Sequence, residues 1–369
     1  MAYQVIIIED DQSMIENMTA TLKTSPDFIL AATFKNANAA IRQSGVFRPD
    51  LFLVNAEDAE SISMLPAFVD LYPKADILGM MSNWVPDMAR KAVEGGAWGC
   101  ILKPFSISDI TEALRLYKTR GKIGLANVIA FFSPKGRAGR TTLAAILALA
   151  LAHKTGERVA LIDADLQFGD LPIFFDAEPE HTIIDATQDI RLINPLNFEP
   201  YFHKIKDNLY LLSSPDKPEY AELVDAESLA EVVRMTCHLF KYVLIDLPAG
   251  FNPISIRMSN FADKVVVMAM INNGFEIQHM SRALRMFKSF TKGINKKIYP
   301  VFSRVNPCTD EEKHKIEAQL GYKVDEILPN EYKMVSIANS GRLSKGLPMD
   351  TLLMQKIDKI ADDIISGKR

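Results

Sequence analysis

A short loop between a predicted strand and a predicted helix carries residue types that bind phosphate. The run Lys135–Thr142 follows an apolar segment and leads into a helical pattern. Backbone N–H groups in such a loop, together with the first turn of the helix, converge on a polyanion. Gly136 and Gly139 allow close approach of phosphate because they lack a Cβ atom. The Thr141 hydroxyl is placed to bind Mg²⁺ and Thr142 to support the phosphates, so the loop predicts a nucleotide site.

Acidic residues end two further apolar runs that follow this loop along the chain. Asp163 and Asp165 close the run that begins at Arg158, and Asp246 closes the run that begins at Tyr242. Each of these acids alone could cap a helix or a turn. Each also ends a predicted strand, so all three acids are candidate residues of the site.

Alternating apolar runs and amphipathic segments must position these residues. In residues 1–118, five apolar runs alternate with five helical patterns, which predicts a parallel sheet covered on both faces. The runs lie at 3–8, 28–33, 50–54, 76–81 and 99–102, and the helical patterns at 12–24, 36–44, 60–71, 86–94 and 106–118. A second series of strand-like runs lies at 127–132, 158–163, 209–213, 242–247, 264–271 and 298–303, with a short edge strand at 323–327.

The alternation predicts an α/β protein with two doubly wound domains, the second with a mainly parallel sheet. Residues 1–118 form the first domain and residues 127–369 form the second. Residues 119–126 contain two glycines and two basic residues, a composition typical of a linker. Within residues 350–367, four apolar residues at helical spacing predict a closing amphipathic helix, and these are Leu353, Ile357, Ile360 and Ile364.

Composition limits the class of protein. The chain has 369 residues, of which 48% are apolar and 24% charged, as expected of a globular protein with an ample core. A formal net charge of −4 argues against a protein whose whole surface binds nucleic acid. Cys100, Cys237 and Cys308 show no CxxC spacing, which indicates reduced thiols. The N-terminal segment has no basic region, and no apolar stretch approaches the roughly 20 residues of a membrane span, so we expect a cytoplasmic protein with at most peripheral membrane contact.

The phosphate loop resembles the deviant Walker A motif of the MinD/ParA family of P-loop NTPases. That motif reads K-G-G-x-G-K-T-T, and this chain reads K-G-R-A-G-R-T-T. The resemblance implies ATP as ligand and a binding loop composed of Lys135, Gly136, Arg137, Ala138, Gly139, Arg140, Thr141 and Thr142. It also implies that Lys135 is catalytic and reaches across an ATP-sandwiched homodimer to the partner's nucleotide.

Two positions of the loop depart from the family's motif. Arg137 replaces a glycine, which restricts the backbone, and Arg140 replaces the phosphate-binding lysine. Arginine keeps the positive charge, but it is bulkier, planar and fork-shaped, so the exchange is not neutral. We therefore expect retained nucleotide binding with slow or absent hydrolysis.

The resemblance extends to the acids and to the region that holds the base. It implies that Asp165 positions the attacking water, that Asp163 supports the metal site, and that Asp246, in a D-x-P-x-G run, holds a Mg²⁺-bound water. The implied metal site comprises Thr141, Asp163 and Asp246. Three residues are implied to flank the adenine, namely Ser303 and Arg304, where the family has Asn-Arg, and Pro329 in a later loop.

The first domain resembles a response-regulator receiver, which has a flavodoxin-like fold. Glu9 and Asp10 match the acidic pair that binds Mg²⁺ in receivers. Ser82 matches the hydroxyl after the fourth strand, and Lys103 matches the lysine after the fifth. We favour a relic ion pair over a working metal site for these residues.

The phosphoacceptor position of the receiver falls at Asn55. An amide cannot form an acyl phosphate because it lacks the carboxylate nucleophile. The domain is therefore interpreted as a pseudo-receiver that serves interaction or localisation. Phosphorylation at Glu57 or Asp58 is the alternative, but the strand register predicts that both lie beyond the pocket.

The order of the two domains, together with the run D-A-D-L-Q-F-G-D, resembles the CpaE/TadZ family of Tad (Flp) pilus assembly proteins. The resemblance covers nearly the whole chain. It implies a dimeric cytoplasmic factor, located at the cell pole near the inner membrane, that helps to recruit the pilus secretion machinery. It implies no specific binding of nucleic acid.

Two other functions stay open from the sequence. A ParA-like role in DNA partitioning is suggested by a basic stretch without acids, composed of Arg282, Arg285, Lys288, Lys292, Lys296 and Lys297. We favour a solvated helix face followed by a basic loop, since long basic side chains commonly cover helix surfaces. The second open function is a MinD-like membrane switch that acts through the closing helix. Its polar face carries Asp350, Asp358, Asp362 and Asp363, which suit anionic lipid poorly, so we expect that helix to pack on the second domain.

Overall fold

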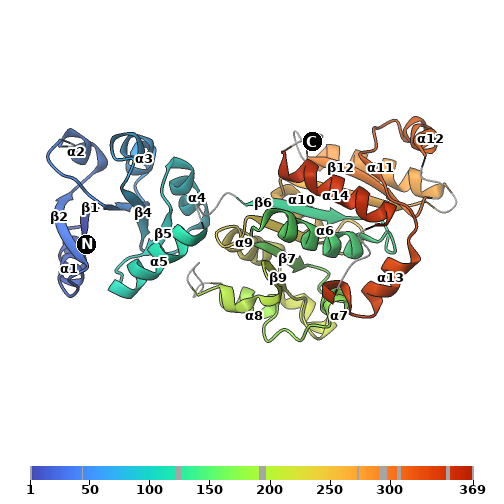
Figure 1. Ribbon diagram of the computed structural model, residues 1–369, viewed down its shortest axis with the longest axis horizontal. Coiled ribbons are helices and arrows are strands. Elements are labelled where there is room, and N and C mark those ends of the chain that lie inside the picture. Colours follow the sequence, from blue (N-terminus) through green and yellow to red (C-terminus); the bar gives the residue numbers. More distant parts are fainter. Residues whose placement is uncertain are drawn as a thin grey trace. The chain divides into compact units, whose positions relative to one another are not determined.

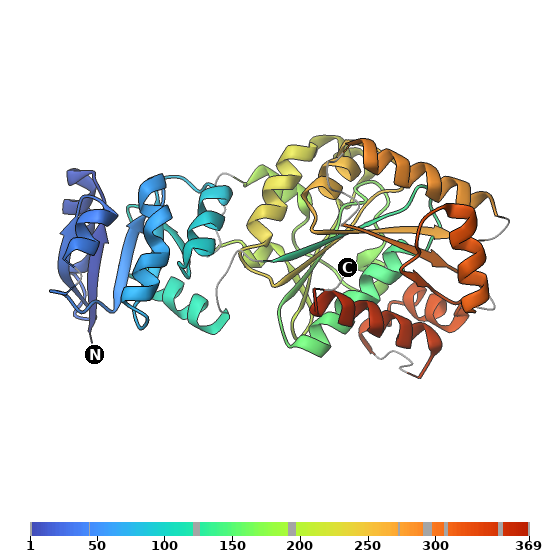
Figure 2. The same ribbon diagram turned by 90° about the horizontal axis from the view of Figure 1, so that it is seen from above.

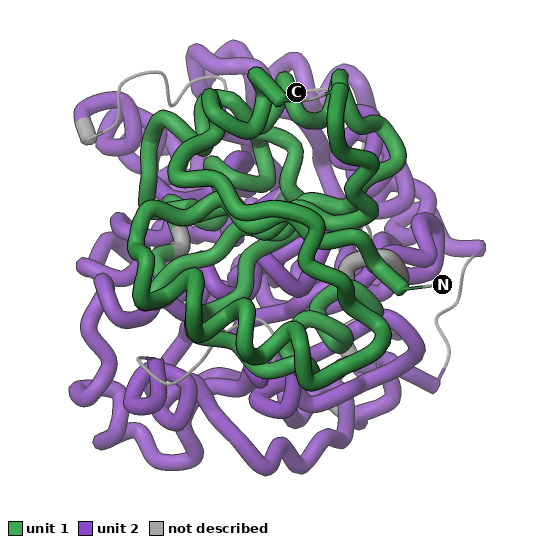
Figure 3. The backbone as a smooth tube through the Cα atoms, turned by 90° about the vertical axis from the view of Figure 1, so that its left-hand side faces the viewer, with its two compact units in different colours: residues 1–126, 194–196 green, residues 127–193, 197–369 purple. Residues whose placement is uncertain are grey.

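The computed structural model describes most of the chain, which Figure 1 draws as a ribbon. The described residues are 2–43, 45–120, 126–190, 197–271, 274–290, 297–305, 309–345 and 350–367. They divide into two compact units, drawn in different colours in Figure 3. The first unit runs to Ala126 and the second begins at Asn127. Of the predicted linker, residues 121–125 lie outside the described residues.

The first unit is a five-stranded parallel sheet in the order β2-β1-β3-β4-β5. Its strands are β1 (Tyr3–Ile8), β2 (Phe28–Phe34), β3 (Leu51–Asn55), β4 (Asp76–Met81) and β5 (Gly99–Leu102). Its helices are α1 (Gln12–Leu22), α2 (Ala37–Arg42), α3 (Ala59–Leu71), α4 (Pro86–Gly95) and α5 (Ile107–Arg120).

Alternate residues of these strands face two separate cores. Val5 and Ile7 of β1 pack with residues of α1 and α5, whereas Ile6 and Ile8 pack with residues of α2, α3 and α4. Successive side chains of a strand point to opposite faces, so a strand covered on both faces reads as a continuous apolar run. The predicted parallel sheet with two covered faces is confirmed.

An eight-stranded sheet forms the centre of the second unit, in the order β13-β12-β11-β6-β10-β7-β9-β8. The strands are β6 (Asn127–Phe132), β7 (Val159–Asp163), β8 (His203–Lys206), β9 (Leu209–Leu212), β10 (Tyr242–Asp246), β11 (Lys264–Met270), β12 (Ile298–Ser303) and β13 (Glu326–Ile327). The helices are α6 (Arg140–Thr155), α7 (Leu171–Phe175), α8 (Ile183–Gln188), α9 (Ala226–Thr236), α10 (Pro253–Phe261), α11 (Phe275–Phe290), α12 (Asp310–Leu320), α13 (Tyr332–Asn339) and α14 (Leu352–Ile365). Figure 2 shows α9 and α11 on one face of the sheet and α6 and α14 on the other. This doubly wound, mainly parallel architecture confirms the predicted fold class.

The outermost strand, β8, is antiparallel to β9, and the sequence analysis missed it. Its four residues, His203–Lys206, alternate between half-buried and exposed side chains. A short, polar edge strand of this kind gives no apolar run, which was the signal used to find the other strands.

Sheet order brings three functional segments to one edge. β10 lies between β6 and β7, and its last residue, Asp246, pairs in register with Phe131 and Asp163. All three strands are parallel, so their carboxyl ends point the same way. The loop after β6 and the acids of β7 and β10 must therefore lie side by side.

The closing helix α14 packs its apolar face on the second unit, as the sequence analysis expected. Leu353, Ile357, Ile360 and Ile364 are buried in the core that includes most of α6. On its polar side, two lysines donate hydrogen bonds to the buried carboxylate of Glu326. Lys356 Nζ lies 2.6 Å from Oε1, and Lys359 Nζ lies 2.8 Å from Oε2. Within the described part of the chain, no helix is long and apolar enough to cross a membrane.

The packing of α14 predicts that two isoleucines of that helix contribute unequally to the stability of the protein. Ile360 is 1% exposed and Ile365 is 42% exposed. We expect Ile360→Ala to lower the free energy of unfolding by about 2–5 kcal/mol, since it leaves a cavity in the core. Ile365→Ala, the matched control, should change it by less than about 0.5 kcal/mol. Urea denaturation of both variants measures the difference, and equal losses would show that α14 does not pack as described.

Candidate nucleotide-binding site

The loop from β6 to α6 has a strained backbone at one of its arginines. Gly139 has a φ of +77° and Arg137 a φ of +67°. Glycine adopts this left-handed region freely, whereas another residue costs about 1–2 kcal/mol there. Arg137 thus keeps a backbone shape suited to glycine, at the position where a glycine was expected. Lys135 and Gly136 are exposed on the same loop.

The Arg140 side chain is buried at the carboxyl ends of the strands, and only 8% of the residue is exposed. Its Nε donates to Asp246 Oδ1 at 2.6 Å and its Nη2 donates to Asp165 Oδ2 at 3.2 Å. Its Nη1 lies 3.4 Å from the Ser133 hydroxyl, which accepts a third bond. Burial alone would lower the pKa of Arg140, but the charges of Asp246 and Asp165 raise it. The guanidinium therefore stays charged and offsets part of the negative charge of these two acids.

The two acids at the strand ends are buried neighbours. Burial raises the pKa of Asp246, although the charge of Arg140 and a hydrogen bond from Thr141 act in the opposite direction. Burial and then the negative charge of Asp246 raise the pKa of Asp163 well above its usual range. The cluster thus holds more acid than its guanidinium neutralises, which favours a further cation.

Thr141 and Asp246 offer oxygen ligands side by side. The Thr141 hydroxyl donates to Asp246 Oδ2 at 2.6 Å. Hydroxyl and carboxylate oxygens are hard ligands that suit Mg²⁺. In the described ranges no cluster of three or more His, Cys, Asp or Glu could hold a metal ion. An ion at Thr141 and Asp246 would therefore need phosphate oxygens and water, as is usual for Mg²⁺ in nucleotide sites.

Asp163 anchors the segment that follows β7. Its Oδ1 accepts the backbone N–H of Asp165 at 3.3 Å, and its Oδ2 accepts that of Leu171 at 3.1 Å. A Cβ atom at Gly169 would clash with this carboxylate and with the Ser214 hydroxyl, so this position requires glycine. No feature of the run D-A-D-L-Q-F-G-D predicts this need for glycine from the sequence alone.

A small cavity of about 70 Å³ joins the loop to the predicted base region. Gly139 and Thr142 line it from the loop side, and Ser303, Arg304 and Pro329 line it from the strand and loop beyond. The Ser303 hydroxyl also donates to the Ala138 carbonyl at 2.7 Å. Residues that are about 160 positions apart therefore meet, as a ligand spanning both regions would require.

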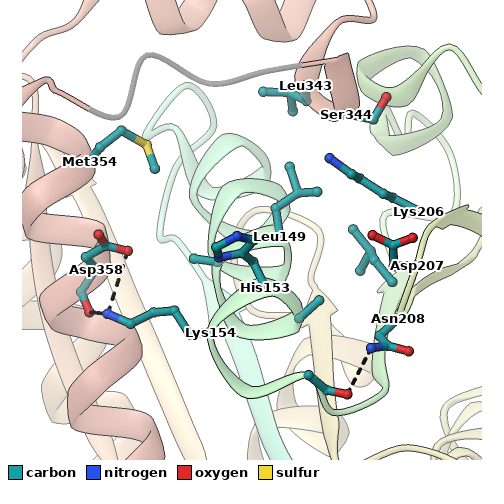
Figure 4. Close-up of a pocket in the computed structure, with 14 residues that line it drawn as sticks. Leu149, His153, Lys154, Lys206, Asp207, Asn208, Leu343, Ser344, Met354 and Asp358 are labelled. Atoms are coloured by element: carbon teal, nitrogen blue, oxygen red, sulfur yellow. Dashed lines mark hydrogen bonds and ion pairs between the residues drawn. The ribbon is translucent and has the colours of Figure 1, made fainter.

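A larger cavity of about 670 Å³ lies at the other end of α6 and contains none of the predicted site residues. Figure 4 shows Leu149, Lys206 and Met354 around it, from α6, β8 and α14. Lys154 at its rim is paired with Asp358 at 3.8 Å. This cavity is separate from the phosphate loop, which lies at the start of the helix.

The residues singled out in the first unit also cluster at the carboxyl ends of their strands. Lys103 Nζ lies 2.6 Å from Glu9 Oε2, and the Asn55 amide donates to Glu9 Oε1 at 3.1 Å. Glu57 was predicted to lie beyond this pocket, and that prediction is wrong, because its carboxylate lies 3.0 Å from Lys103 Nζ. Asp58 caps α3 instead.

Comparison with known proteins gives the same division of the chain. A sequence profile of the CobQ/CobB/MinD/ParA nucleotide binding domain matches residues 129–343. A profile of the response regulator receiver domain matches residues 5–115.

Individual relatives match the second unit. The septum site-determining protein MinD of Thermotoga maritima is 28% identical over 228 residues, which cover 59% of this chain and 80% of that protein. An uncharacterised ATP-binding protein of Methanocaldococcus jannaschii is 32% identical over 145 residues, 38% of this chain and 52% of that protein. The alignment therefore spans only about half the length of the second relative.

Solved structures share the fold of this unit. A ParA family ATPase from Chlorobium tepidum aligns with a TM-score of 0.58 and 20% identity, over 64% of this chain and 98% of that one. MinD from Pyrococcus horikoshii, solved in complex with Mg-ADP, aligns with a TM-score of 0.56 and 18% identity, over 66% and 98%. Since the nucleotide-binding profile matches more than half of its residues, the chain belongs to the CobQ/CobB/MinD/ParA nucleotide-binding domain family, and its first unit has the receiver fold.

Proposed function

We propose that this chain is an ATP-binding, dimeric assembly factor of the CpaE/TadZ type that serves the Tad (Flp) pilus secretion machinery. The observation that carries the proposal is the pairing of two units in this order. A receiver fold with an amide, Asn55, at the acceptor position precedes a MinD/ParA-type unit. Residues 1–118 would be the pseudo-receiver, 119–126 the linker and 127–369 the nucleotide-binding domain.

ATP is the proposed ligand of the second unit. Its phosphates would lie on residues 135–142 and its adenine beside Ser303, Arg304 and Pro329. Support comes from the cavity that these three residues share with the start of α6. A bound Mg²⁺ ion would be held by Thr141 and Asp246 and would supply positive charge to the phosphate oxygens. Asp163 would support the metal site and keep the neighbouring segment in place.

Slow hydrolysis is proposed because of the contacts of Arg140. Asp165, the proposed water-positioning acid, and Asp246 both accept hydrogen bonds from its guanidinium. Charge-assisted bonds of this kind are roughly twice as strong as neutral ones, so Asp165 is held away from an attacking water. Asp246 bonds Arg140 through Oδ1, and its Oδ2 stays beside the Thr141 hydroxyl, where a metal ion would bind. Binding of phosphate requires only donors and positive charge, which the loop retains.

Homodimerisation is proposed through the carboxyl edge of the sheet. Lys135 is exposed there on the phosphate loop. Large apolar side chains are exposed in the segments that follow β7, β9 and β11, namely Phe168, Leu223 and Phe275, which are 73%, 61% and 67% exposed. Large exposed apolar side chains are typical of a surface that a second protein covers.

A location in the cytoplasm, at the cell pole near the inner membrane, belongs to the same proposal. The pseudo-receiver would supply the surface that recognises the pilus or polar partner, because its acceptor position cannot be phosphorylated.

The partitioning function is the second candidate, and it depends on the basic stretch. Arg282 and Arg285 of α11 are exposed. Lys288 lies over the Tyr322 ring at 5.1 Å, and Lys297 donates to the Ala262 carbonyl at 3.0 Å, so these two have contacts within the protein. Lys292 and Lys296 lie outside the described residues. ATP-dependent, salt-sensitive binding of DNA would favour this candidate.

A MinD-like membrane switch is disfavoured, because the apolar face of α14 is buried in the second unit. Pelleting with anionic liposomes in ATP and Mg²⁺ would favour it.

Hydrolysis provides the first test. We expect Arg140→Lys to raise the rate of ATP hydrolysis by about tenfold or more, a change of about 1.4 kcal/mol in the barrier, because the slimmer lysine releases Asp165. Phosphate release in Mg²⁺ measures it. Arg137→Lys, the control at the exposed arginine of the same loop, should leave the rate low. Turnover of the unaltered chain as fast as that of Arg140→Lys would contradict slow hydrolysis.

Dimerisation provides the second test. Sedimentation velocity with ATP and Mg²⁺ is expected to show a dimer that Lys135→Ala weakens at least tenfold, since a cation that reaches the partner's phosphates is lost. Lys241→Ala is the matched control, because this exposed lysine precedes β10 and so lies at the opposite edge of the sheet. The proposed role of Lys135 fails if both variants dimerise alike.

The pilus role requires a test in the source organism. We expect deletion of the gene to abolish Tad pili on the cell surface, and a fluorescent fusion of the chain to gather at a pole. A complementing copy with Lys135→Ala should restore fewer pili than one with Lys241→Ala. Normal piliation of the deletion strain, scored by electron microscopy, would rule out the proposed function.

A further inference from the structure

A carboxylate of the first unit occupies a place suited to a bound oxyanion. Glu57 follows β3, and its side chain turns back toward the ends of β4 and β5. The Ser82 backbone N–H donates to Glu57 Oε1 at 2.9 Å, and the Ser82 hydroxyl donates to Oε2 at 3.0 Å. Lys103 Nζ lies 3.0 Å from the same Oε2. An ammonium, a hydroxyl and a backbone N–H are the donors that a phosphate oxyanion would use.

Asn55 fixes the approach of Glu57 to this pocket. The Asn55 side-chain oxygen accepts the backbone N–H of Glu57 at 3.0 Å. Its amide nitrogen donates to Glu9 at 3.1 Å and to Asp10 at 3.4 Å. Asn55 thus faces the acids on one side and orients the chain at Glu57 on the other.

Lys103 is shared between two carboxylates. Its side chain is 5% exposed, and it contacts Glu9 at 2.6 Å in addition to Glu57. A buried ammonium needs such partners, because an unpaired charge in this position would be strongly destabilising. Glu57 reaches Lys103 from the outer side, since 31% of the Glu57 side chain is exposed.

We propose that Glu57 is a built-in anion that fills an oxyanion pocket formed by Ser82 and Lys103. It ties the ends of β3, β4 and β5 together, and so it holds the segment from Ser82 to α4 in one conformation without phosphate. The pocket takes inorganic phosphate when the Glu57 carboxylate is removed.

Covalent attachment gives Glu57 the advantage over a free anion. A group tethered by a short stretch of chain acts at an effective concentration on the order of millimolar or higher. Free phosphate must displace it from the same donors of Ser82 and Lys103. The first unit is therefore insensitive to phosphate and to phosphate donors, independently of the nucleotide site in the second unit.

Hydrogen exchange at Ser82 tests the proposal directly, because its amide donates to Glu57. In the full chain, we expect Glu57→Ala to raise the exchange rate of this amide at least tenfold. Glu57→Gln, which keeps the size and an acceptor oxygen but loses the charge, should give an intermediate rate. Glu60→Ala is the matched control, because Glu60 lies in the first turn of α3 and its side chain contacts Asn38.

Inorganic phosphate supplies the second arm of the experiment. Phosphate at tens of millimolar should slow the exchange of the Ser82 amide in Glu57→Ala toward the rate of the unaltered chain, and should leave the unaltered chain unchanged. The proposal is overturned if Glu57→Ala exchanges as slowly as the unaltered chain, or if phosphate protects both chains equally. If phosphate does not slow exchange of the Ser82 amide in Glu57→Ala, the proposal that Ser82 and Lys103 form an oxyanion pocket is overturned.

Discussion

The contact of Arg140 with Asp246 and Asp165 is the interaction on which the second unit most depends. It joins the first residue of α6 to the ends of β10 and β7. Loss of one partner from a buried ion pair costs about 3–5 kcal/mol, because the remaining charge has no compensation. The same contact limits chemistry, since a guanidinium engaged with two carboxylates must give up those bonds before it can follow a reacting phosphate. Stability of the ligand-free protein and the slow turnover that we propose thus have one physical origin.

In both units, a charged side chain of the chain itself contacts the groups that an ion or phosphate would otherwise contact. In the second unit, Arg140 offsets part of the negative charge of the acids at the proposed Mg²⁺ site. In the first, Glu57 occupies donors that a phosphoryl group would otherwise use. Each site keeps most of the residue types of its family's motif, but its charges are already paired within the chain. Such pairing favours binding and fixed surfaces over turnover and phosphotransfer, as the proposed assembly role requires.

Most of the fold could be predicted because buried parallel strands leave a strong pattern. The apolar runs gave every parallel strand, and β10 between β6 and β7 explains why Asp163, Asp246 and the phosphate loop meet. Strand β8 was missed because its four residues, three of them polar and none fully buried, carry no such pattern. The need for glycine at position 169 was also invisible, since it depends on atoms of Asp163 and Ser214 that only the folded chain brings together.

Side-chain reach limited the prediction of both sites. Strand register places Glu57 two residues past the end of β3, and that position alone predicts that Glu57 lies beyond the pocket of Lys103. The turn after β3 instead directs its long side chain back, and Asn55 holds that turn. Likewise, the sequence identified Arg140 as an unusual phosphate ligand, yet gave no sign that its guanidinium would face the acids. A long charged side chain can reach several partners, and local geometry decides which of them it contacts. A sequence motif therefore predicts the position of such a residue but not its contacts.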